Sequence, residues 1–276
     1  MPLICMYVFG GLGNQLFMIF AMLGYTFENG VPFKICPLNI GNKRPYYWGN
    51  FLKNLRSFIT YDEHSVRILN LYKENDNLEY NKIESSIDKF RCYGYFQSYK
   101  YFEGHLENIM RMTGIDKQKQ WVCNMYNGDT SKTVSLHVRI GDYVKVQEYH
   151  NILSINYYKR ALCKVIEKRG EEEVNHVLIF GEQQNMKELL EIKTELETEY
   201  EGIEFEIIDS TLRDYNQMLI MSNCRDNIIA NSSFSLMAAH INLNNDKIVV
   251  YPNEWFGPLN NDKKIEDMFR EEWIKC

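Results

Sequence analysis

The second half of the chain alternates short apolar segments with longer amphipathic segments, and this alternation constrains the fold more than any other feature. The apolar segments lack the period-two polar pattern of a half-exposed strand, which is typical of strands in a parallel sheet covered on both faces. The predicted strands are residues 134–138, 174–180, 205–208, 227–230 and 248–251, and the predicted helices are residues 155–169, 183–200, 215–222 and 234–241. We therefore expect an α/β fold.

The first 27 residues carry no charged side chain, which on length alone would fit a signal peptide or a membrane anchor. Glycines at positions 10, 11 and 13 interrupt this stretch, and no Lys or Arg precedes it. We interpret it instead as a buried strand (3–8), a glycine loop and a buried helix (15–29) that ends at Gly30. We expect no membrane anchor.

The rest of the first half is less regular, with a predicted strand at residues 90–95 and a predicted helix at residues 100–113. A polar stretch at residues 124–132 separates it from the second half. We therefore predict two α/β domains, residues 1–123 and 124–276, that face each other across a cleft.

Charge and cysteine content exclude several classes of protein. The net charge is −6 and no basic block is present, which argues against a nucleic-acid partner bound by phosphate neutralisation. The seven cysteines are scattered and show no CxxC or Cys/His ligand spacing. We expect reduced thiols, a cytoplasmic location and no metal site.

The glycine loop, GGLGNQLF at residues 10–17, joins the first strand to the first helix. Glycine permits a tight turn close to a ligand, and a helix N-terminus offers free N–H groups to an anion. The dinucleotide fingerprint GxGxxG is incomplete, because Leu16 stands at the third glycine position and no acidic residue follows at the expected distance. An anion site and a purely structural turn both remain open.

A second segment, SLHVRIGDY at residues 135–143, ends a predicted strand. His137 and Arg139 lie on one side of it and emerge at the carboxyl edge, where open parallel sheets bind ligands. A guanidinium group there suits a diphosphate. The alternative is structural: Arg139 pairs with Asp142, and His137 is a hydrogen-bonded core residue.

A third segment, NSSFS at residues 231–235, again lies between a strand and a helix. Its hydroxyls and the free N–H groups of the helix would form a cradle for an oxyanion, complementary to a diphosphate held by Arg139. Ordinary helix N-capping explains the same residues equally well.

Together these segments resemble a known family. GGLGNQLF, GYFQSYKYF (94–102), SLHVRIGDYV (135–144), INYYKRAL (155–162) and IIANSSFSLMAAHIN (228–242) are similar, in order and spacing, to the α-1,2-fucosyltransferases of glycosyltransferase family 11. The resemblance implies a GT-B fold, in which two Rossmann-like domains face each other across a cleft. It also implies metal-independent, inverting transfer of L-fucose from GDP-β-L-fucose, bound mainly by the C-terminal domain. The acceptor would be the 2-hydroxyl of a galactose in an oligosaccharide.

The family's HxRRxD motif matches His137, Arg139 and Asp142, which we predict to be catalytic. Arg139 would bind the β-phosphate and stabilise the charge on departing GDP. Asp142 is the first candidate for the general base, although holding Arg139 in place is an equally good role for it. The predicted donor-binding residues are Gly11, Gly13, Asn14, His137, Arg139, Asn231, Ser232, Ser233, Phe234 and Ser235.

The sequence departs from the family pattern at three places. Ile140 replaces the second Arg of the motif, Gly181-Glu182-Gln183 replaces paired Asp residues, and Leu236 and Met237 replace two Trp. The first departure keeps another GDP-sugar or another linkage open as an alternative. A non-catalytic nucleotide-sugar-binding protein is a further alternative.

Aromatic residues of the first domain are candidates for stacking on acceptor sugars. For each of them individually we favour a role in the core; they are Tyr46, Tyr47, Trp48, Tyr95 and Phe96.

Overall fold

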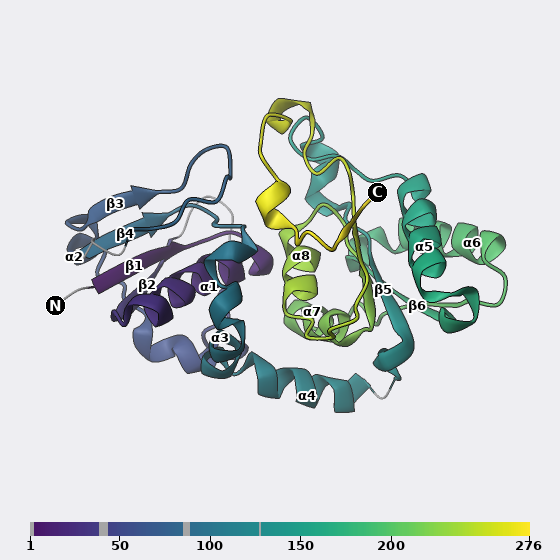
Figure 1. Ribbon diagram of the computed structural model, residues 1–276, viewed down its shortest axis with the longest axis horizontal. Helices are drawn as coiled ribbons and strands as arrows, with labels where there is room; N and C mark the ends of the chain where they lie inside the picture. The colour runs from purple at the N-terminus through teal and green to yellow at the C-terminus, as the bar shows by residue number, and fades with distance from the viewer. Residues whose placement is uncertain (1–2, 39–43, 85–88, 127) are drawn as a thin grey trace. The chain divides into compact units, whose positions relative to one another are not determined.

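A computed structural model describes residues 3–38, 44–84, 89–126 and 128–276 of the protein. Contacts divide the chain into an N-terminal unit (residues 1–118 and 263–270) and a C-terminal unit (residues 119–262 and 271–276). Each unit contains its own parallel β sheet (Figure 1). The predicted domain boundary after residue 123 stays a prediction; the division by contacts falls after residue 118 and assigns residues 263–270 to the N-terminal unit.

The sheet of the N-terminal unit has the strand order β2-β1-β4-β3. Its strands are β1 (Leu3–Val8), β2 (Phe33–Pro37), β3 (Asn70–Lys73) and β4 (Lys89–Tyr93), and its helices are α1 (Leu12–Asn29), α2 (Glu63–Arg67) and α3 (Leu106–Thr113). Helix α4 (Ile115–Tyr126) leads from this unit into the next. The predicted strands at residues 3–8 and 90–95 therefore correspond to β1 and β4.

Helix α1 is buried along almost its whole length, because apolar side chains lie on every side of it. Gly30 ends the helix in the left-handed conformation, with φ of 64° and its N–H bonded to the Thr26 carbonyl, as the sequence predicts. The helix begins at Leu12, three residues before the predicted start. Gly13 and Asn14 therefore lie in the first helical turn and not in the loop.

The sheet of the C-terminal unit has the strand order β10-β9-β8-β5-β6-β7, and every pair of neighbours is parallel. Its strands are β5 (Thr133–His137), β6 (His176–Phe180), β7 (Glu204–Ile207), β8 (Asp226–Ile228), β9 (Val249–Tyr251) and β10 (Ile274–Lys275). The helices are α5 (Ile155–Arg169), α6 (Met186–Glu199), α7 (Asp214–Asn223) and α8 (Ser233–His240). Helices α5 and α6 lie on one face and α7 and α8 on the other (Figure 1), which confirms the predicted doubly covered sheet.

The order of these strands determines where a ligand is expected. From β5 the chain first moves outward through β6 and β7, then returns to the other side of β5 and continues through β8, β9 and β10. This is the Rossmann order, and the reversal between β5 and β8 is its switch point. Open sheets of this kind bind ligands at the switch point, outside the carboxyl ends of the strands.

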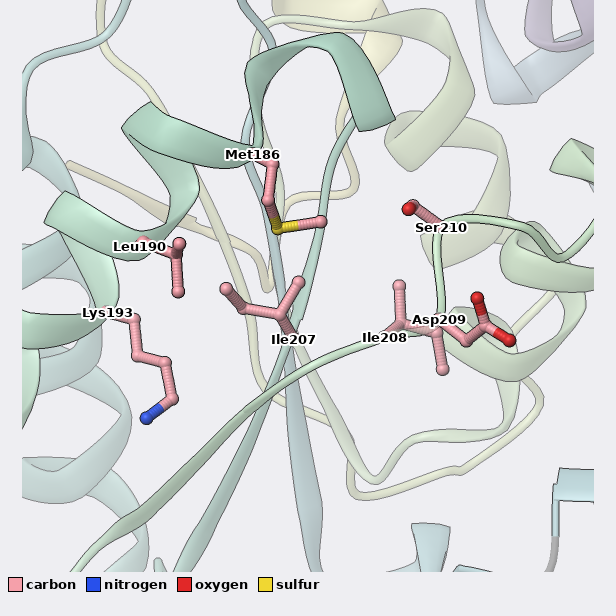
Figure 2. Close-up of a pocket in the computed structure, with 7 residues that line it drawn as sticks. All are labelled: Met186, Leu190, Lys193, Ile207, Ile208, Asp209 and Ser210. Carbon is pink, nitrogen blue, oxygen red and sulfur yellow. The ribbon is translucent and has the colours of Figure 1, made fainter.

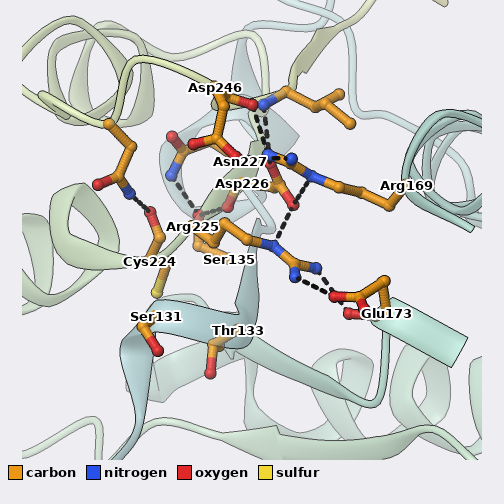
Figure 3. A network of polar contacts seen from close by, with 12 residues as sticks. Ser131, Thr133, Ser135, Arg169, Glu173, Cys224, Arg225, Asp226, Asn227 and Asp246 are labelled. Atoms are coloured by element: carbon orange, nitrogen blue, oxygen red, sulfur yellow. Dashed lines mark hydrogen bonds and ion pairs between the residues drawn. The ribbon is translucent and has the colours of Figure 1, made fainter.

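A buried polar network anchors the opposite edge of this sheet, at the amino ends of β5 and β8. Figure 3 shows the Asp226 carboxylate between the guanidinium groups of Arg169 and Arg225, which donate to it at 2.7 and 2.9 Å. The Asp226 side chain is completely buried. A buried carboxylate needs such partners to offset its lost hydration, so the network is structural.

Candidate active site

Two of the three predicted segments meet at the switch point of the C-terminal unit. Residues 138–143 follow the carboxyl end of β5, and residues 229–235 follow the carboxyl end of β8 and begin α8. The Tyr143 hydroxyl donates to the Asn231 carbonyl at 2.9 Å and so joins the two loops. The third segment, the glycine loop, belongs to the N-terminal unit.

His137 is the last residue of β5 and is only 5% exposed. Its Nδ1 lies 2.9 Å from the Ser235 hydroxyl, and its ring contacts Phe234 at a centroid distance of 5.4 Å. Burial, with a smaller contribution from the Arg139 charge, lowers the pKa of His137 to about 3. The imidazole is therefore neutral at physiological pH, and it holds the first turn of α8 against β5.

Arg139 lies two residues beyond β5, with its side chain 17% exposed. One terminal nitrogen donates to Glu182 at 2.9 Å, the other to Asp142, and the guanidinium carbon lies 5.0 Å above the Tyr143 ring. The pair with Asp142 is the contact of the structural alternative. Because two carboxylates contact one guanidinium, we expect a bound diphosphate to compete with them for it.

Glu182 follows β6 and was not among the predicted site residues. Its approach to Arg139 depends on Gly141, where an added Cβ would lie only 1.8 Å from the Glu182 Oε2. Gly141 also has φ of 37°, and its N–H donates to the Asn185 side chain at 3.0 Å. The loops after β5 and β6 are thus fitted to each other. The sequence feature that could have identified Glu182 as a site residue is its position just after a second parallel strand.

The NSSFS segment divides into residues that hold the structure and residues that face outward. Ser232 caps α8 by accepting from the Phe234 N–H at 3.3 Å, as the capping alternative predicts. The buried Ser235 hydroxyl is engaged with His137. Ser233 and Phe234 are half-buried and lie in the first turn of α8, whose free N–H groups and positive dipole end favour an anion.

Asn231 is nearly completely buried. Its side-chain nitrogen donates to the Asn151 carbonyl at 2.8 Å and to the Trp255 carbonyl at 3.1 Å. The amide thereby ties the loop after β8 to two other loops. Among the described residues its Oδ1 has no hydrogen-bond partner, although the atom is buried.

The glycine loop begins with Gly10 at φ of 79°, and Gly11 is the N-cap of α1. Nothing lies within 4 Å of a Cβ placed on Gly11. Asn14 accepts from the Gln97 side chain at 2.8 Å, and the buried Gln15 donates to the Gly10 carbonyl at 2.9 Å. Two of the motifs that carry the family resemblance, GGLGNQLF and GYFQSYKYF, are therefore joined within the N-terminal unit.

The aromatic residues proposed for acceptor stacking are mainly core residues, as favoured above. Tyr47, Trp48 and Phe96 are buried. The Tyr46 hydroxyl donates to the Val8 and Leu38 carbonyls. Tyr95 differs, since it is 38% exposed and its ring lies against Phe9 at 5.2 Å.

Residues 70–276 match the model of glycosyl transferase family 11. The chain belongs to this family. The O-antigen biosynthesis glycosyltransferase WbnK of Escherichia coli is 28% identical over 193 residues, which span 66% of this chain and 59% of that protein. The alpha-1,2-colitosyltransferase of Escherichia coli is 23% identical over a 299-residue alignment that spans 96% of both chains.

The predicted GT-B fold class is also confirmed. The structure of Escherichia coli ADP-heptose lps heptosyltransferase II superposes with a TM-score of 0.50 at 10% identity, covering 100% of this chain and 90% of that one. The family 11 chain thus has the α/β fold of a GT-B glycosyltransferase. In the part of the chain that the structure describes, none of the helices combines the length and apolarity needed to cross a membrane.

Proposed function

We propose that this glycosyltransferase moves L-fucose from GDP-β-L-fucose to the 2-hydroxyl of a galactose in an oligosaccharide acceptor, with inversion at the anomeric carbon. The family and the α-1,2 linkage formed by the colitosyltransferase relative support the reaction. The observation that carries the proposal is the position of Arg139 at the switch point, over the ring of Tyr143, whose hydroxyl bonds to the Asn231 carbonyl two residues before the start of α8. A guanidinium group together with a helix N-terminus suits a diphosphate.

In the proposed reaction, the acceptor hydroxyl oxygen attacks the anomeric carbon while the bond from that carbon to the β-phosphate oxygen breaks. GDP leaves with the electron pair. Arg139 and the N–H groups at the start of α8 stabilise the negative charge that develops on it. Since these groups supply the positive charge, we propose that no metal ion is needed.

The acceptor proton requires a base, for which Asp142 remains the first candidate. Its side chain is 51% exposed, and in this structure it is paired with Arg139. When the β-phosphate takes the guanidinium, that pair opens and the carboxylate can accept the acceptor proton. Neutral His137 is poorly suited to this task, because its pKa of about 3 makes it a weak base; it positions Ser235 instead.

The donor-binding set is proposed on the same basis. Ser232, Ser233 and Phe234 would present the N-terminus of α8 to the phosphates, while Asn231 and Ser235 would hold that turn in place. Gly11, Gly13 and Asn14 are proposed from the family resemblance to contact the donor from the N-terminal unit. The seven free cysteines suit a reducing compartment, which supports a cytoplasmic location.

A second donor is favoured by the relative that aligns along almost the whole chain, a colitosyltransferase. Colitose differs from fucose only in lacking the 3-hydroxyl. Ile140, which replaces the second Arg of the family motif, is adjacent to Arg139 and is the first residue to examine if the fucosyl donor fails.

The test is release of GDP from GDP-fucose, GDP-colitose and GDP-mannose, with lactose and N-acetyllactosamine as acceptors and with EDTA present. We expect acceptor-dependent release from GDP-fucose, unchanged by EDTA and reduced at least about a hundredfold by Arg139→Ala. Arg111→Ala, on α3 in the N-terminal unit, is the matched control. Release from another GDP-sugar alone would refute the proposed donor, and binding without turnover would indicate a non-catalytic protein.

A further inference from the structure

Glu182 has acceptor capacity that its contacts in this structure do not use. Its Oε1 accepts from Arg139 at 2.9 Å and its Oε2 accepts from the Gln184 side chain at 3.1 Å. An ionised carboxylate offers about four lone-pair directions, so about half remain available. The side chain is 36% exposed, which leaves it accessible to a ligand.

The position of Glu182 in the topology is the second observation. Residue 182 lies two residues past the end of β6, the strand that pairs with β5 on the side away from the switch point. In Rossmann sheets, an acidic residue at the end of the second strand accepts hydrogen bonds from the ribose hydroxyls of a bound nucleotide. The diphosphate group lies beside it, over the first strand.

A cavity of about 360 Å³ lies one strand further out, beside the carboxyl end of β7. Figure 2 shows Met186 and Leu190 of α6 on one side of it and Ile207 at the end of β7. The volume is in the range of small-molecule sites, and its aliphatic walls suit the flat faces of a nucleobase. The Asp209 carboxylate points away from Met186 and Leu190 and is bonded to the Thr211 N–H at 2.9 Å.

These features follow one another along the carboxyl edge of the sheet. Neighbouring strands are about 4.8 Å apart, so β6 and β7 lie roughly 5 and 10 Å from β5. Arg139 follows β5, Glu182 follows β6, and the cavity adjoins β7. This is the order of diphosphate, ribose and base in a nucleoside diphosphate.

We propose that the Glu182 carboxylate accepts hydrogen bonds from the ribose hydroxyls of the donor nucleotide and that the cavity beside β7 holds its base. The inference rests on the proposed function only in taking the donor to be a nucleoside diphosphate sugar. On donor binding, Glu182 exchanges Arg139 for the ribose, and the guanidinium turns to the β-phosphate.

The test compares affinities for GDP, 2′-deoxy-GDP and 3′-deoxy-GDP by calorimetry in the wild type, Glu182→Ala and the near-isosteric Glu182→Gln. The control is Glu191→Ala on α6, whose carboxylate is exposed. We expect the wild type and the control to bind at least one deoxy analogue about tenfold more weakly than GDP. In Glu182→Ala the ratio of the affinity for GDP to the affinity for that deoxy analogue falls below about two, and Glu182→Gln gives an intermediate ratio.

Because the ratio is measured within each protein, a general loss of affinity cancels. If Glu182→Ala loses affinity for all three nucleotides but keeps the wild-type ratio, Glu182 acts only through Arg139 and the ribose contact is refuted. If the wild type binds ADP or UDP but not GDP, the proposed donor is wrong, and the same ratio measured with that nucleotide still tests Glu182. If no nucleoside diphosphate binds, both proposals fail.

The base position has its own variant. Leu190 is 51% exposed on α6, so Leu190→Trp should leave the fold intact while its indole fills the cavity. We expect GDP to bind at least about tenfold more weakly to this variant, with an unchanged melting temperature. Wild-type GDP affinity in Leu190→Trp would refute the placement of the base.

Discussion

Gly141 is predicted to act on the donor site through Glu182, so the effect of Gly141→Ala should depend on which residue occupies position 182. The added Cβ would lie 1.8 Å from the Glu182 Oε2 and 2.9 Å from its Cδ, which is far inside contact distance. The carboxylate must therefore move away from the position from which it would accept hydrogen bonds from the donor ribose. In addition, φ of 37° costs a non-glycine residue about 1–2 kcal/mol.

The expected magnitudes separate these two effects. Losing one partly exposed hydrogen bond from the ribose to this carboxylate is worth about 1 kcal/mol, or a factor of about five in donor affinity. In the wild-type background, Gly141→Ala should therefore weaken GDP binding about five- to tenfold and lower the free energy of unfolding by about 1–2 kcal/mol. In the Glu182→Ala background, the same substitution should change GDP binding less than about twofold, because no carboxylate remains to be displaced.

Calorimetric titration of GDP into the wild type, the two single variants and the double variant measures this coupling. Urea denaturation of the same four proteins reports the backbone cost separately. Equal losses of affinity on adding Gly141→Ala to either background would refute the reasoning, since Gly141 would then act independently of Glu182.

Four further predictions concern stability and the arrangement of the site. Asp226→Ala should lower the free energy of unfolding by about 3–5 kcal/mol, because it leaves two guanidinium groups without their buried partner. Asp246→Ala, at an exposed carboxylate, serves as the control. A loss below about 1 kcal/mol in Asp226→Ala would contradict the structural role of the network in Figure 3. Ser235→Ala should cost about 1–3 kcal/mol in chemical denaturation, since the buried His137 Nδ1 loses its partner, and a neutral outcome would show that the bond is dispensable. Because the pKa of His137 is lowered to about 3, the unfolded chain binds a proton there between pH 6.5 and about 3 while the folded chain does not, so the free energy of unfolding falls as the pH falls through that window. His137→Asn should flatten the dependence of the unfolding free energy on pH in this window, and an unchanged slope would contradict the lowered pKa. Tyr143→Phe keeps the ring beneath Arg139 but removes the bond to the Asn231 carbonyl, so the KM for the donor should rise a few-fold with the fold intact, whereas a wild-type KM would show that this bond does not position the site.

The fold of the C-terminal unit was predictable because its strands are apolar and regularly spaced by helices. Two of the strands that were missed gave no such signal. Strand β3 is mostly exposed at the edge of its sheet, and β10 has only two residues. The predicted helix at 100–113 starts instead at Leu106, because residues 99–105 form two short 3-10 turns, which share much of the helical sequence pattern.

The candidate site was predictable where position along the sheet alone determines proximity. Residues after β5 and β8 meet at the switch point, as their positions at strand ends in the sequence indicated, whereas the roles of His137, Arg139 and the NSSFS segment stay predictions. Glu182 was missed because its contact with Arg139 spans 43 positions and depends on the space left by Gly141. Such a fit between two loops is a property of packing and leaves no periodic pattern in the sequence.

The most direct measurement is a crystal structure of the protein with GDP bound. We expect the β-phosphate to lie within hydrogen-bond distance of the Arg139 guanidinium and of the N–H groups that begin α8, with the Asp142 carboxylate released from Arg139. A GDP molecule bound elsewhere, with Arg139 still paired to Asp142 and Glu182, would contradict the assignment of the switch point as the donor site.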